Sequence, residues 1–167
     1  GSIEILQLLI DKGADLNIAN TKNVTALHVA VNVNEVNTAR FLVANGIDLE
    51  VKYTPGGFTA IELAKNLNRL EVIEVIKLGI SQNKIKKHLD NDTKLPLDIR
   101  KDKYLIALTN HLKKEQYHEA LMYFSYFDEM KISTSSSFTY FWGEALFKIG
   151  ESQSALSKFY EYLTDEG

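Results

Sequence analysis

The chain has 167 residues, of which 45% are apolar, and it carries 19 basic against 22 acidic side chains, a net charge of −3. This composition supports one globular domain or two small modules, and it lacks the basic excess by which proteins bind nucleic acid. The absence of cysteine excludes disulfides and thiolate metal sites and fits a reducing, cytoplasmic compartment. The apolar runs are too short to span a membrane, so we expect no membrane partner and no leader.

Aromatic residues separate the chain into two parts of different chemistry. Of the 17 aromatic side chains, 14 lie after position 100. The first part must therefore pack small and aliphatic side chains, whereas the last part packs aromatic rings. We predict two modules, joined between Gly79 and Asp98.

The first part repeats at a spacing of 33 or 34 residues. Gly13 has a counterpart in Gly46, and the tetrapeptide Thr-Ala-Leu-His at residues 25–28 returns as Thr-Ala-Ile-Glu at residues 59–62. Such a spacing predicts a stacked repeat protein, in which each unit buries its apolar face against its neighbours. Helices are predicted over residues 1–12, 25–33 and 35–45. Gly13 and Gly46 are expected to end the helices that precede them.

These residues resemble the ankyrin repeat, whose pattern can be followed through residues 1–79. The matching positions of the central repeat are Thr25, Leu27, His28, Ala30, Leu42, Gly46 and Asp48, with Ala26 in place of the usual proline. The resemblance implies a hairpin-like loop followed by two antiparallel helices in each repeat, with the threonine and histidine tying neighbouring loops together. The first repeat lacks its first helix, so we expect a fragment of a longer array. Its remaining helix would expose Ile5, Leu6 and Leu9.

The third repeat departs from the pattern. Its loop at residues 53–58 is one residue longer, Glu62 replaces the histidine, and the usual Gly-Ala-Asp ending is missing after Val75. We therefore interpret it as the last ankyrin unit. Tyr53 and Phe58 beside the loop tip are suited to anchor a partner, and the equally favoured alternative is that Phe58 packs on its own loop.

A helical linker is predicted over residues 80–97. A short amphipathic helix is expected from Ile80 to Lys94, after which Pro96 interrupts the chain and Asp98 can cap the next helix. The linker would cover the end of the ankyrin stack. Its lysines are interpreted as a solvated face.

From residue 98 a second spacing, of 35 residues, appears. It relates Tyr117 to Ser152, Ala120 to Ala155 and Phe124 to Phe159. Together with Gly143 and Gly150, these residues resemble the tetratricopeptide repeat, and the resemblance implies a helix-turn-helix array over residues 98–167. Two positions depart from that family: Leu108 stands where a small residue is usual, and Glu115 where the turn glycine is.

No catalytic, cofactor or metal site is predicted. His111, Glu115 and His118 could share a helix face, but a turn expected at residues 114–116 would separate them, and a metal site needs three or four converging ligands. The sequence holds no phosphate-binding glycine motif and no activated serine. His28 is interpreted as a structural residue of the ankyrin motif. We therefore expect neither an enzyme nor a small-molecule substrate.

The predicted fold class is all-α, an ankyrin solenoid followed by a tetratricopeptide-like array, and the predicted function is to bind a protein or peptide on the concave repeat surface. The resemblance implies that the positions facing a partner in the ankyrin part are Thr21, Lys22, Val24, Asn32, Val33, Pro55, Gly56, Phe58, Asn66 and Leu67. Tyr53 is expected to contact the partner as well, as an anchor beside the loop tip. In the tetratricopeptide-like part the inward positions are Leu105, Thr109, Leu112, Tyr140, Glu144 and Phe147. Among these inward positions, Tyr140 and Glu144 are the two that we expect to contact a partner. The alternative for Leu105, Leu112, Tyr140 and Phe147 is that they pack between helices or against the linker.

Two rival functions belong to other classes. The chain could be the targeting or regulatory arm of a larger enzyme or of a secreted bacterial effector, a reading that fits its truncated first repeat and its abundance of Lys, Asn and Ile. It could also be a module for self-association. The sequence does not name a partner for any of these functions.

Overall fold

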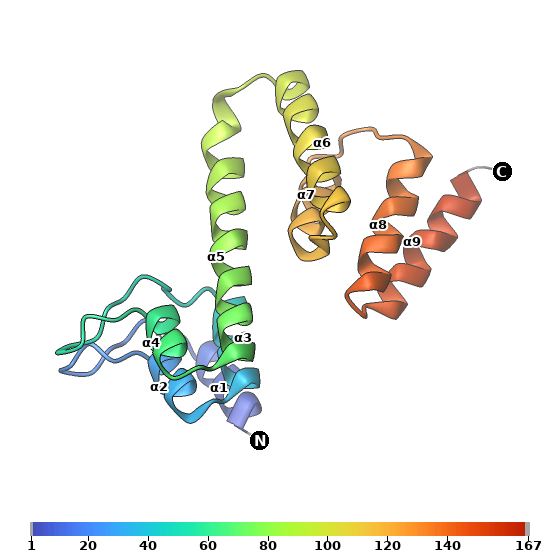
Figure 1. The fold of residues 1–167 in the computed structure, drawn as a ribbon. Coiled ribbons are helices and arrows are strands. Elements are labelled where there is room, and N and C mark those ends of the chain that lie inside the picture. The colour runs from blue at the N-terminus through green and yellow to red at the C-terminus, as the bar shows by residue number, and fades with distance from the viewer. Residues whose placement is uncertain (1, 166–167) are drawn as a thin grey trace. The chain divides into compact units, whose positions relative to one another are not determined.

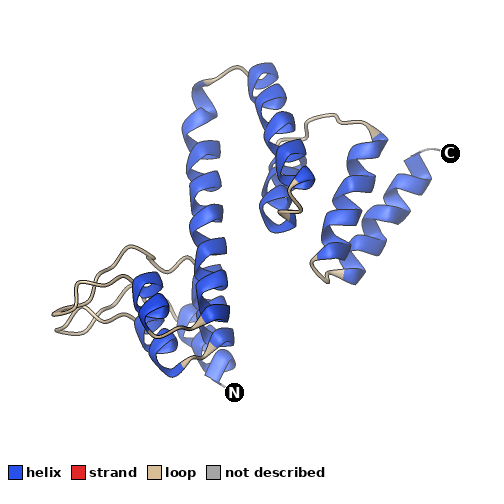
Figure 2. Ribbon diagram, viewed as in Figure 1, coloured by secondary structure: helices blue, strands red, loops and turns tan. Residues whose placement is uncertain are grey.

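The structure, a computed structural model, describes residues 2–165. This part of the chain is helical and contains no strand (Figure 2), which confirms the predicted all-α class. The helices in chain order are α1 Ser2–Asp11, α2 Ala26–Val33, α3 Val36–Ala44, α4 Ala60–Asn66, α5 Leu70–Asn91, the 3₁₀ turn η1 Asp92–Lys94, α6 Leu97–Lys113, α7 Tyr117–Glu129, α8 Ser136–Lys148 and α9 Ser152–Asp165. Among these described helices, none is long and apolar enough to cross a membrane.

The chain forms two compact units, residues 1–81 and residues 82–167, each with its own core. Helix α5 contributes its first half to unit 1 and its last residues to unit 2 (Figure 1). The core of unit 1 is aliphatic and that of unit 2 is largely aromatic, as the distribution of aromatic residues indicates.

Unit 1 is built from short helices that pack in succession. Helix α2 contacts both α3 and α4, and α1 contacts α3 (Figure 1). The turns between them repeat with the sequence, since Gly13 and Gly46 have φ of 83° and 80°, and Asn34 and Asn68 have φ of 60° and 54°. Glycine and asparagine are the residues that adopt this left-handed geometry most readily. The local chemistry of the repeat therefore determines where each helix ends.

The third repeat uses a carboxylate where the second uses an imidazole. The Thr59 backbone N–H donates to Glu62 Oε2 at 2.8 Å, and the Glu62 backbone N–H donates to Thr59 Oγ1 at 3.4 Å, a reciprocal capping arrangement at the start of α4. The hydrogen bonds that the Thr59 backbone N–H and hydroxyl donate to the Glu62 carboxylate lower the pKa of Glu62. The replacement of histidine by Glu62 thus keeps the helix cap while removing the ring that reaches the next loop.

The structure corrects the expected end of the third repeat. The helix predicted to begin at Ile80 is the second half of α5, which continues through Gly79. Gly79 is buried, and a Cβ atom there would lie 3.3 Å from Leu49 Cδ1 and collide with Val43 Cγ1. This glycine allows close packing of α5 rather than ending a helix.

On α1, Ile5 and Leu9 are 62% and 49% exposed, as expected, whereas Leu6 is half-buried.

Unit 2 is a succession of antiparallel helix pairs. The contacts run from α6 to α7, from α7 to α8 and from α8 to α9. Phe124 is at the centre of the core, with its ring stacked on Trp142 at 5.7 Å and edge-on to Phe138 at 4.8 Å. Ile85 and Leu89 of the end of α5 pack against the same core.

The 35-residue spacing is visible in the geometry of unit 2. Tyr117 and Ser152 are the first residues of α7 and α9. Glu115, with φ of 57°, and Gly150, with φ of 89°, take the left-handed conformation at equivalent turns. The turn predicted at residues 114–116 is therefore present, with a glutamate where glycine fits best.

Candidate functional site

A small hollow opens on unit 1, between helices α2 and α4 and the loops that precede them. It has a volume of about 240 Å³. Its lining residues are Val24, His28, Val29, Asn32, Tyr53 and Leu63. Three of these are predicted contact positions, namely Val24, Asn32 and Tyr53. His28 was interpreted from the sequence as structural, and Val29 and Leu63 were not among the predicted contacts.

His28 lines the hollow and joins two repeats. The Thr25 backbone N–H donates to His28 Nδ1 at 3.3 Å, so the ring proton resides on Nε2, which lies 3.3 Å from the carbonyl oxygen of Phe58. The ring of Tyr53 lies edge-on to the imidazole at 5.5 Å. Desolvation by burial lowers the pKa of His28, and the ring is therefore neutral near pH 7. Neutral and fully engaged, it is a structural side chain.

The two loops beside the hollow, which contain Lys22 and Thr54, are joined by hydrogen bonds to backbone carbonyl oxygens. The N–H and the hydroxyl of Thr54 both donate to the carbonyl oxygen of Lys22, at 2.7 and 3.1 Å. The Asn23 side-chain amide donates to the carbonyl oxygen of Lys52 at 2.8 Å. These bonds span 29–32 residues of sequence and hold the two loops in register. The surface beside the hollow is thus preorganised, which reduces the entropy lost on binding.

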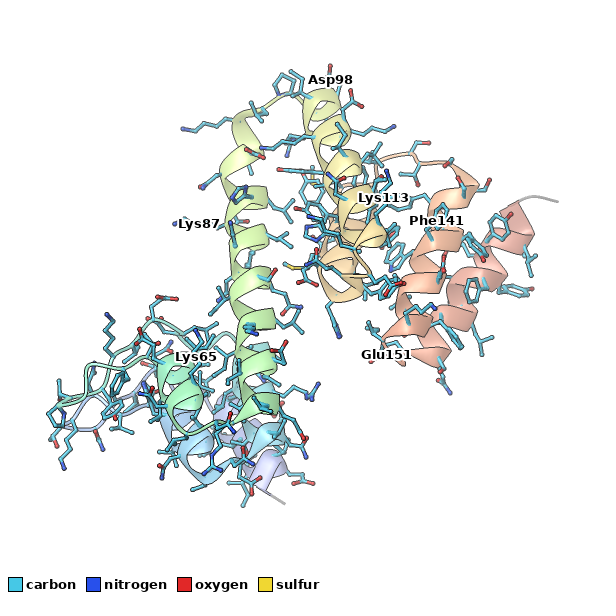
Figure 3. The ribbon with its side chains drawn as sticks, in the orientation of Figure 1. Lys65, Lys87, Asp98, Lys113, Phe141 and Glu151 are labelled. Atoms are coloured by element: carbon cyan, nitrogen blue, oxygen red, sulfur yellow. The ribbon has the colours of Figure 1, made fainter. Side chains whose placement is uncertain are left out.

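A larger groove, of about 450 Å³, lies within unit 2 between α6, α7 and α8. Its apolar lining comes from Leu105, Leu108, Leu112, Tyr117, Phe124, Phe138 and Phe141. Thr109, Lys113, Ser135, Ser137 and Glu144 add polar groups. Figure 3 labels Lys113 on α6 and Phe141 on α8, two of the side chains that line it. The groove can receive apolar side chains while its rim satisfies backbone groups.

Comparison with known proteins identifies the first part of the chain. The family model for ankyrin repeats, in three copies, matches residues 1–86. The chain belongs to the ankyrin-repeat family. It is 38% identical over 64 residues to "Ankyrin repeat and KH domain-containing protein mask-1" of Caenorhabditis elegans, an alignment that covers 38% of this chain and 2% of that protein. The chain thus spans a small fraction of that relative's length.

Ankyrin repeats are protein-interaction modules, so the first unit of this chain indicates a protein-binding function. The match ends at residue 86, and the helices beyond it lie outside the assigned family. Unit 2 is therefore a helical remainder of the ankyrin-repeat protein.

The other predicted contact positions of the ankyrin unit lie outside the hollow. All are exposed: Thr21, Lys22, Val33, Pro55, Gly56, Phe58, Asn66 and Leu67. Val33 and Leu67 are 56% and 37% exposed at the ends of α2 and α4. Phe58 packs on its own loop and also remains accessible to a partner. Its ring lies 6.1 Å from the ring of Tyr53, and the side chain is 36% exposed.

The inward positions predicted for unit 2 fall into two groups. Leu105, Thr109, Leu112 and Glu144 line the groove. Tyr140 lies elsewhere, because its ring packs at 5.7 Å from Phe159 and 5.6 Å from Tyr162 on α9, and it is 43% exposed. Phe147 is 61% exposed and does not line the groove.

His111 of unit 2 has ordinary structural partners. His111 Nδ1 lies 3.0 Å from Gln116 Oε1, and the ring stacks on Tyr123 at 5.6 Å. Within residues 2–165, no group of three or more His, Cys, Asp or Glu side chains is placed to hold a metal ion.

Proposed function

We propose that this ankyrin-repeat chain is a non-catalytic scaffold that binds a protein or peptide on the inner surface of its repeats. The inner surface is defined as the hollow together with Val33, Phe58 and Leu67. Two pairs of residues, each separated by the 34-residue repeat, support this surface. Val33 is equivalent to Leu67, and Val24 is equivalent to Phe58. Each pair repeats an apolar, solvent-accessible side chain from one unit to the next.

The observation that carries the proposal is the exposure of apolar side chains on a fixed framework. Val33 and Leu67 remain 56% and 37% exposed at the C-terminal ends of α2 and α4, where the Arg69 guanidinium donates to the carbonyl oxygen of Asn32 at 3.2 Å and ties the two repeats together. Scattered exposed apolar residues are common on any protein. Apolar residues recurring at equivalent positions beside an aromatic-lined hollow are typical of a binding surface, where a few anchors supply most of the affinity.

We also infer that unit 2 is a tetratricopeptide-like pair whose groove is a second binding surface. Its support is the 35-residue spacing and the contact of Gly143 with α9, since a Cβ atom at Gly143 would lie 2.8 Å from the ring of Phe159. The groove is lined by four of the positions expected to face inward. An apolar peptide segment is the ligand class that this lining favours.

The experiment is affinity capture from a lysate of the source cells, quantified by mass spectrometry. The inner-surface variant carries Val33→Glu, Phe58→Ala and Leu67→Glu. The control variant carries Ile5→Glu and Leu70→Glu, which add the same two charges to side chains that are 62% and 66% exposed on α1 and α5. Far-UV circular dichroism verifies that each variant is folded.

We expect a set of proteins that the parent and the control retain and that the inner-surface variant loses at least tenfold. Equal retention by the parent and the inner-surface variant would show that the inner surface is not the recognition site. The test then moves to the groove, where Leu112→Glu is expected to abolish the same capture. Retention that survives both variants contradicts the scaffold proposal.

A further inference from the structure

The groove of unit 2, between α6, α7 and α8, contains one carboxylate within its apolar lining. Of the described residues that line the groove, Glu144 is the only acid and Lys113 the only base. Glu144 belongs to α8 and is half-buried. A carboxylate that loses part of its hydration needs a hydrogen-bond donor or a cation in compensation. The group that meets Glu144 therefore decides which ligand the groove accepts.

The protein itself supplies no such group. Within residues 2–165, no hydrogen bond or ion pair engages the Glu144 carboxylate, although Lys148 follows it by one helical turn and Lys113 lines the same groove. Thr109 is its equivalent at the 35-residue spacing, and the Thr109 hydroxyl donates to the Leu105 carbonyl oxygen of its own helix at 2.7 Å. The polar side chain at this position is thus satisfied locally in α6 and left open in α8.

An exposed aromatic ring lies next to the open carboxylate. Phe141 precedes Glu144 by three residues, and side chains with this spacing are neighbours on one face of a helix, with Cβ atoms roughly 5–6 Å apart. Both line the groove. Phe141 is 45% exposed, and its one ring contact in the described part of the chain is with Tyr140 at 5.6 Å. A cation placed here is attracted by the quadrupole of the ring and by the charge of the carboxylate.

The chemistry of this pair favours arginine over lysine. A guanidinium is planar, so it stacks on an aromatic ring and donates two hydrogen bonds to one carboxylate, whereas an ammonium is a compact and strongly hydrated charge. The apolar stem of an arginine can lie along the groove lining, to which Leu112 and Phe138 contribute. Lys113 belongs to α6 and Phe141 to α8 (Figure 3), so the basic group and the pair lie on different walls.

We propose that Phe141 and Glu144 form a subsite for an arginine side chain, and that the peptide segment bound in the groove carries this arginine among apolar residues. The inference rests on the proposed function, because it specifies the ligand of the groove that forms the second binding surface. An apolar groove does not by itself require a basic ligand residue. The subsite can therefore fail while the groove stands.

The probe is a phage-displayed library of random dodecapeptides, selected on the immobilised whole chain. Counter-selection on the Leu112→Glu chain removes phage that bind outside the groove. Enriched sequences are synthesised with a fluorescein label, and their affinities for the parent, Glu144→Gln and Phe141→Leu chains are measured by fluorescence anisotropy. The matched control is Glu129→Gln, which removes one acidic charge from an exposed residue of α7 outside the groove lining. Far-UV circular dichroism verifies that each variant is folded.

We expect the enriched peptides to share an arginine flanked by apolar residues and to bind the parent and the Glu129→Gln chain equally. Glu144→Gln should weaken binding at least tenfold, and Phe141→Leu at least threefold. A peptide with norleucine in place of the arginine should lose the same tenfold on the parent and little more on the Glu144→Gln chain, because both changes remove one interaction. A peptide with glutamate in that place should bind the Glu144→Lys chain more tightly than it binds the parent.

The subsite and the groove fail in different ways. Peptides that the Leu112→Glu chain no longer binds, but that carry no basic residue or bind the Glu144→Gln chain unchanged, would overturn the subsite and leave the groove intact. Equal losses of the arginine and norleucine peptides on the Glu144→Gln chain would also overturn it, because Glu144 would then act on the structure of the groove alone. No enrichment over the Leu112→Glu chain would overturn the groove and the subsite together.

Discussion

The Nε2 atom of His28 lies 3.3 Å from the carbonyl oxygen of Phe58, so a side chain of the second ankyrin repeat holds the backbone of the third. Its other ring nitrogen receives the backbone N–H of Thr25. The contact with Thr25 depends on a neutral ring, because a protonated Nδ1 could no longer accept from its N–H, whereas Nε2 can donate to the Phe58 carbonyl in either state. A single imidazole therefore links the helix cap of one repeat to the loop of the next and also lines the hollow.

The first prediction is that unit 1 loses stability as the pH falls below about 6.5, the ordinary histidine pKa. Burial lowers the pKa of His28 in the folded state, so the unfolded state binds the proton first and stability rises with pH through this window. His28 is the only histidine in residues 1–81. Urea unfolding followed by the NMR amide signals of residues 25–64, at a series of pH values, measures the effect.

The variant His28→Leu provides the control. It should lower the free energy of unfolding of unit 1 at neutral pH by about 1–3 kcal/mol, because the Phe58 carbonyl and the Thr25 N–H lose their partner. It should also flatten the pH dependence between pH 7.5 and 5.5. An unchanged slope in this variant would mean that another group controls the transition.

The second prediction concerns Gly79, in the middle of α5. Replacing a helical glycine by alanine ordinarily stabilises a helix by about 1 kcal/mol. At Gly79 the new methyl group would collide with Val43, and overpacking of a core costs about 1–3 kcal/mol. Gly79→Ala is therefore expected to destabilise unit 1 despite its higher helix propensity.

The double variant Gly79→Ala with Val43→Ala distinguishes collision from other causes. Val43 is only half-buried, so its own truncation should be mild. If the collision is the cause, the double variant is more stable than the sum of the two single effects predicts. Strict additivity in urea unfolding would remove the steric explanation.

The third prediction uses the two equivalent turns of unit 2. Glu115 has φ of 57°, a conformation that costs a non-glycine residue about 1–2 kcal/mol, whereas Gly150 at φ of 89° adopts it freely. Glu115→Gly should therefore stabilise unit 2 by about 1 kcal/mol, and Gly150→Ala should destabilise it by a similar amount. Trp142, the only tryptophan, lies in unit 2, so its fluorescence during urea unfolding reports on this unit alone.

Lys114→Gly is the matched control, because Lys114 precedes Glu115 and has an ordinary φ of −94°. Glycine there increases the entropy of the unfolded chain without relieving strain, so a loss of stability is expected. If Lys114→Gly and Glu115→Gly change the unfolding midpoint in the same direction, the left-handed geometry is not the source of the gain.

The sequence predicted best those features that depend on neighbouring residues. The turns at Gly13, Gly46 and Gly150 follow from backbone geometry within a few positions. The all-α class was implied by the resemblance to the ankyrin and tetratricopeptide families, whose motifs are made of such positions. In each case the residue type and its function are local, so one sequence is sufficient to recognise them.

Features that depend on distant contacts were not recognisable in this way. Gly79 has the appearance of a helix end, and only its contact with Val43 and Leu49, more than 29 residues earlier, shows that it is a packing residue inside a continuous helix. Tyr140 was expected on the inward face, but its ring packs against Phe159 and Tyr162 of the following helix. Side chains that can turn toward either neighbour have no signature in the spacing alone.

The last prediction concerns the start of unit 2, where Asp92 receives two donors. Its Oδ2 atom accepts a hydrogen bond from the Tyr104 hydroxyl at 2.9 Å and pairs with Lys103 Nζ. These contacts lower the pKa of Asp92, with Lys103 contributing most. Burial and the bond to Asp92 raise the pKa of Tyr104, so the phenol remains a donor at neutral pH.

Removing the phenolic hydroxyl tests the contribution of this cluster. Tyr104 is 2% exposed, and Tyr104→Phe keeps the ring packing while it removes one hydrogen bond to a carboxylate, an expected loss of about 1–2 kcal/mol. Because the pKa of Asp92 is lowered on folding, its contribution is complete above about pH 4, its unfolded value, and disappears as the pH falls through the folded pKa. The difference in Trp142-detected stability between the parent and Asp92→Asn should therefore shrink between pH 6 and pH 3. A difference that stays constant over that range would show that the charge of Asp92 does not stabilise the unit, and Tyr104→Phe would then measure the loss of the hydrogen bond alone.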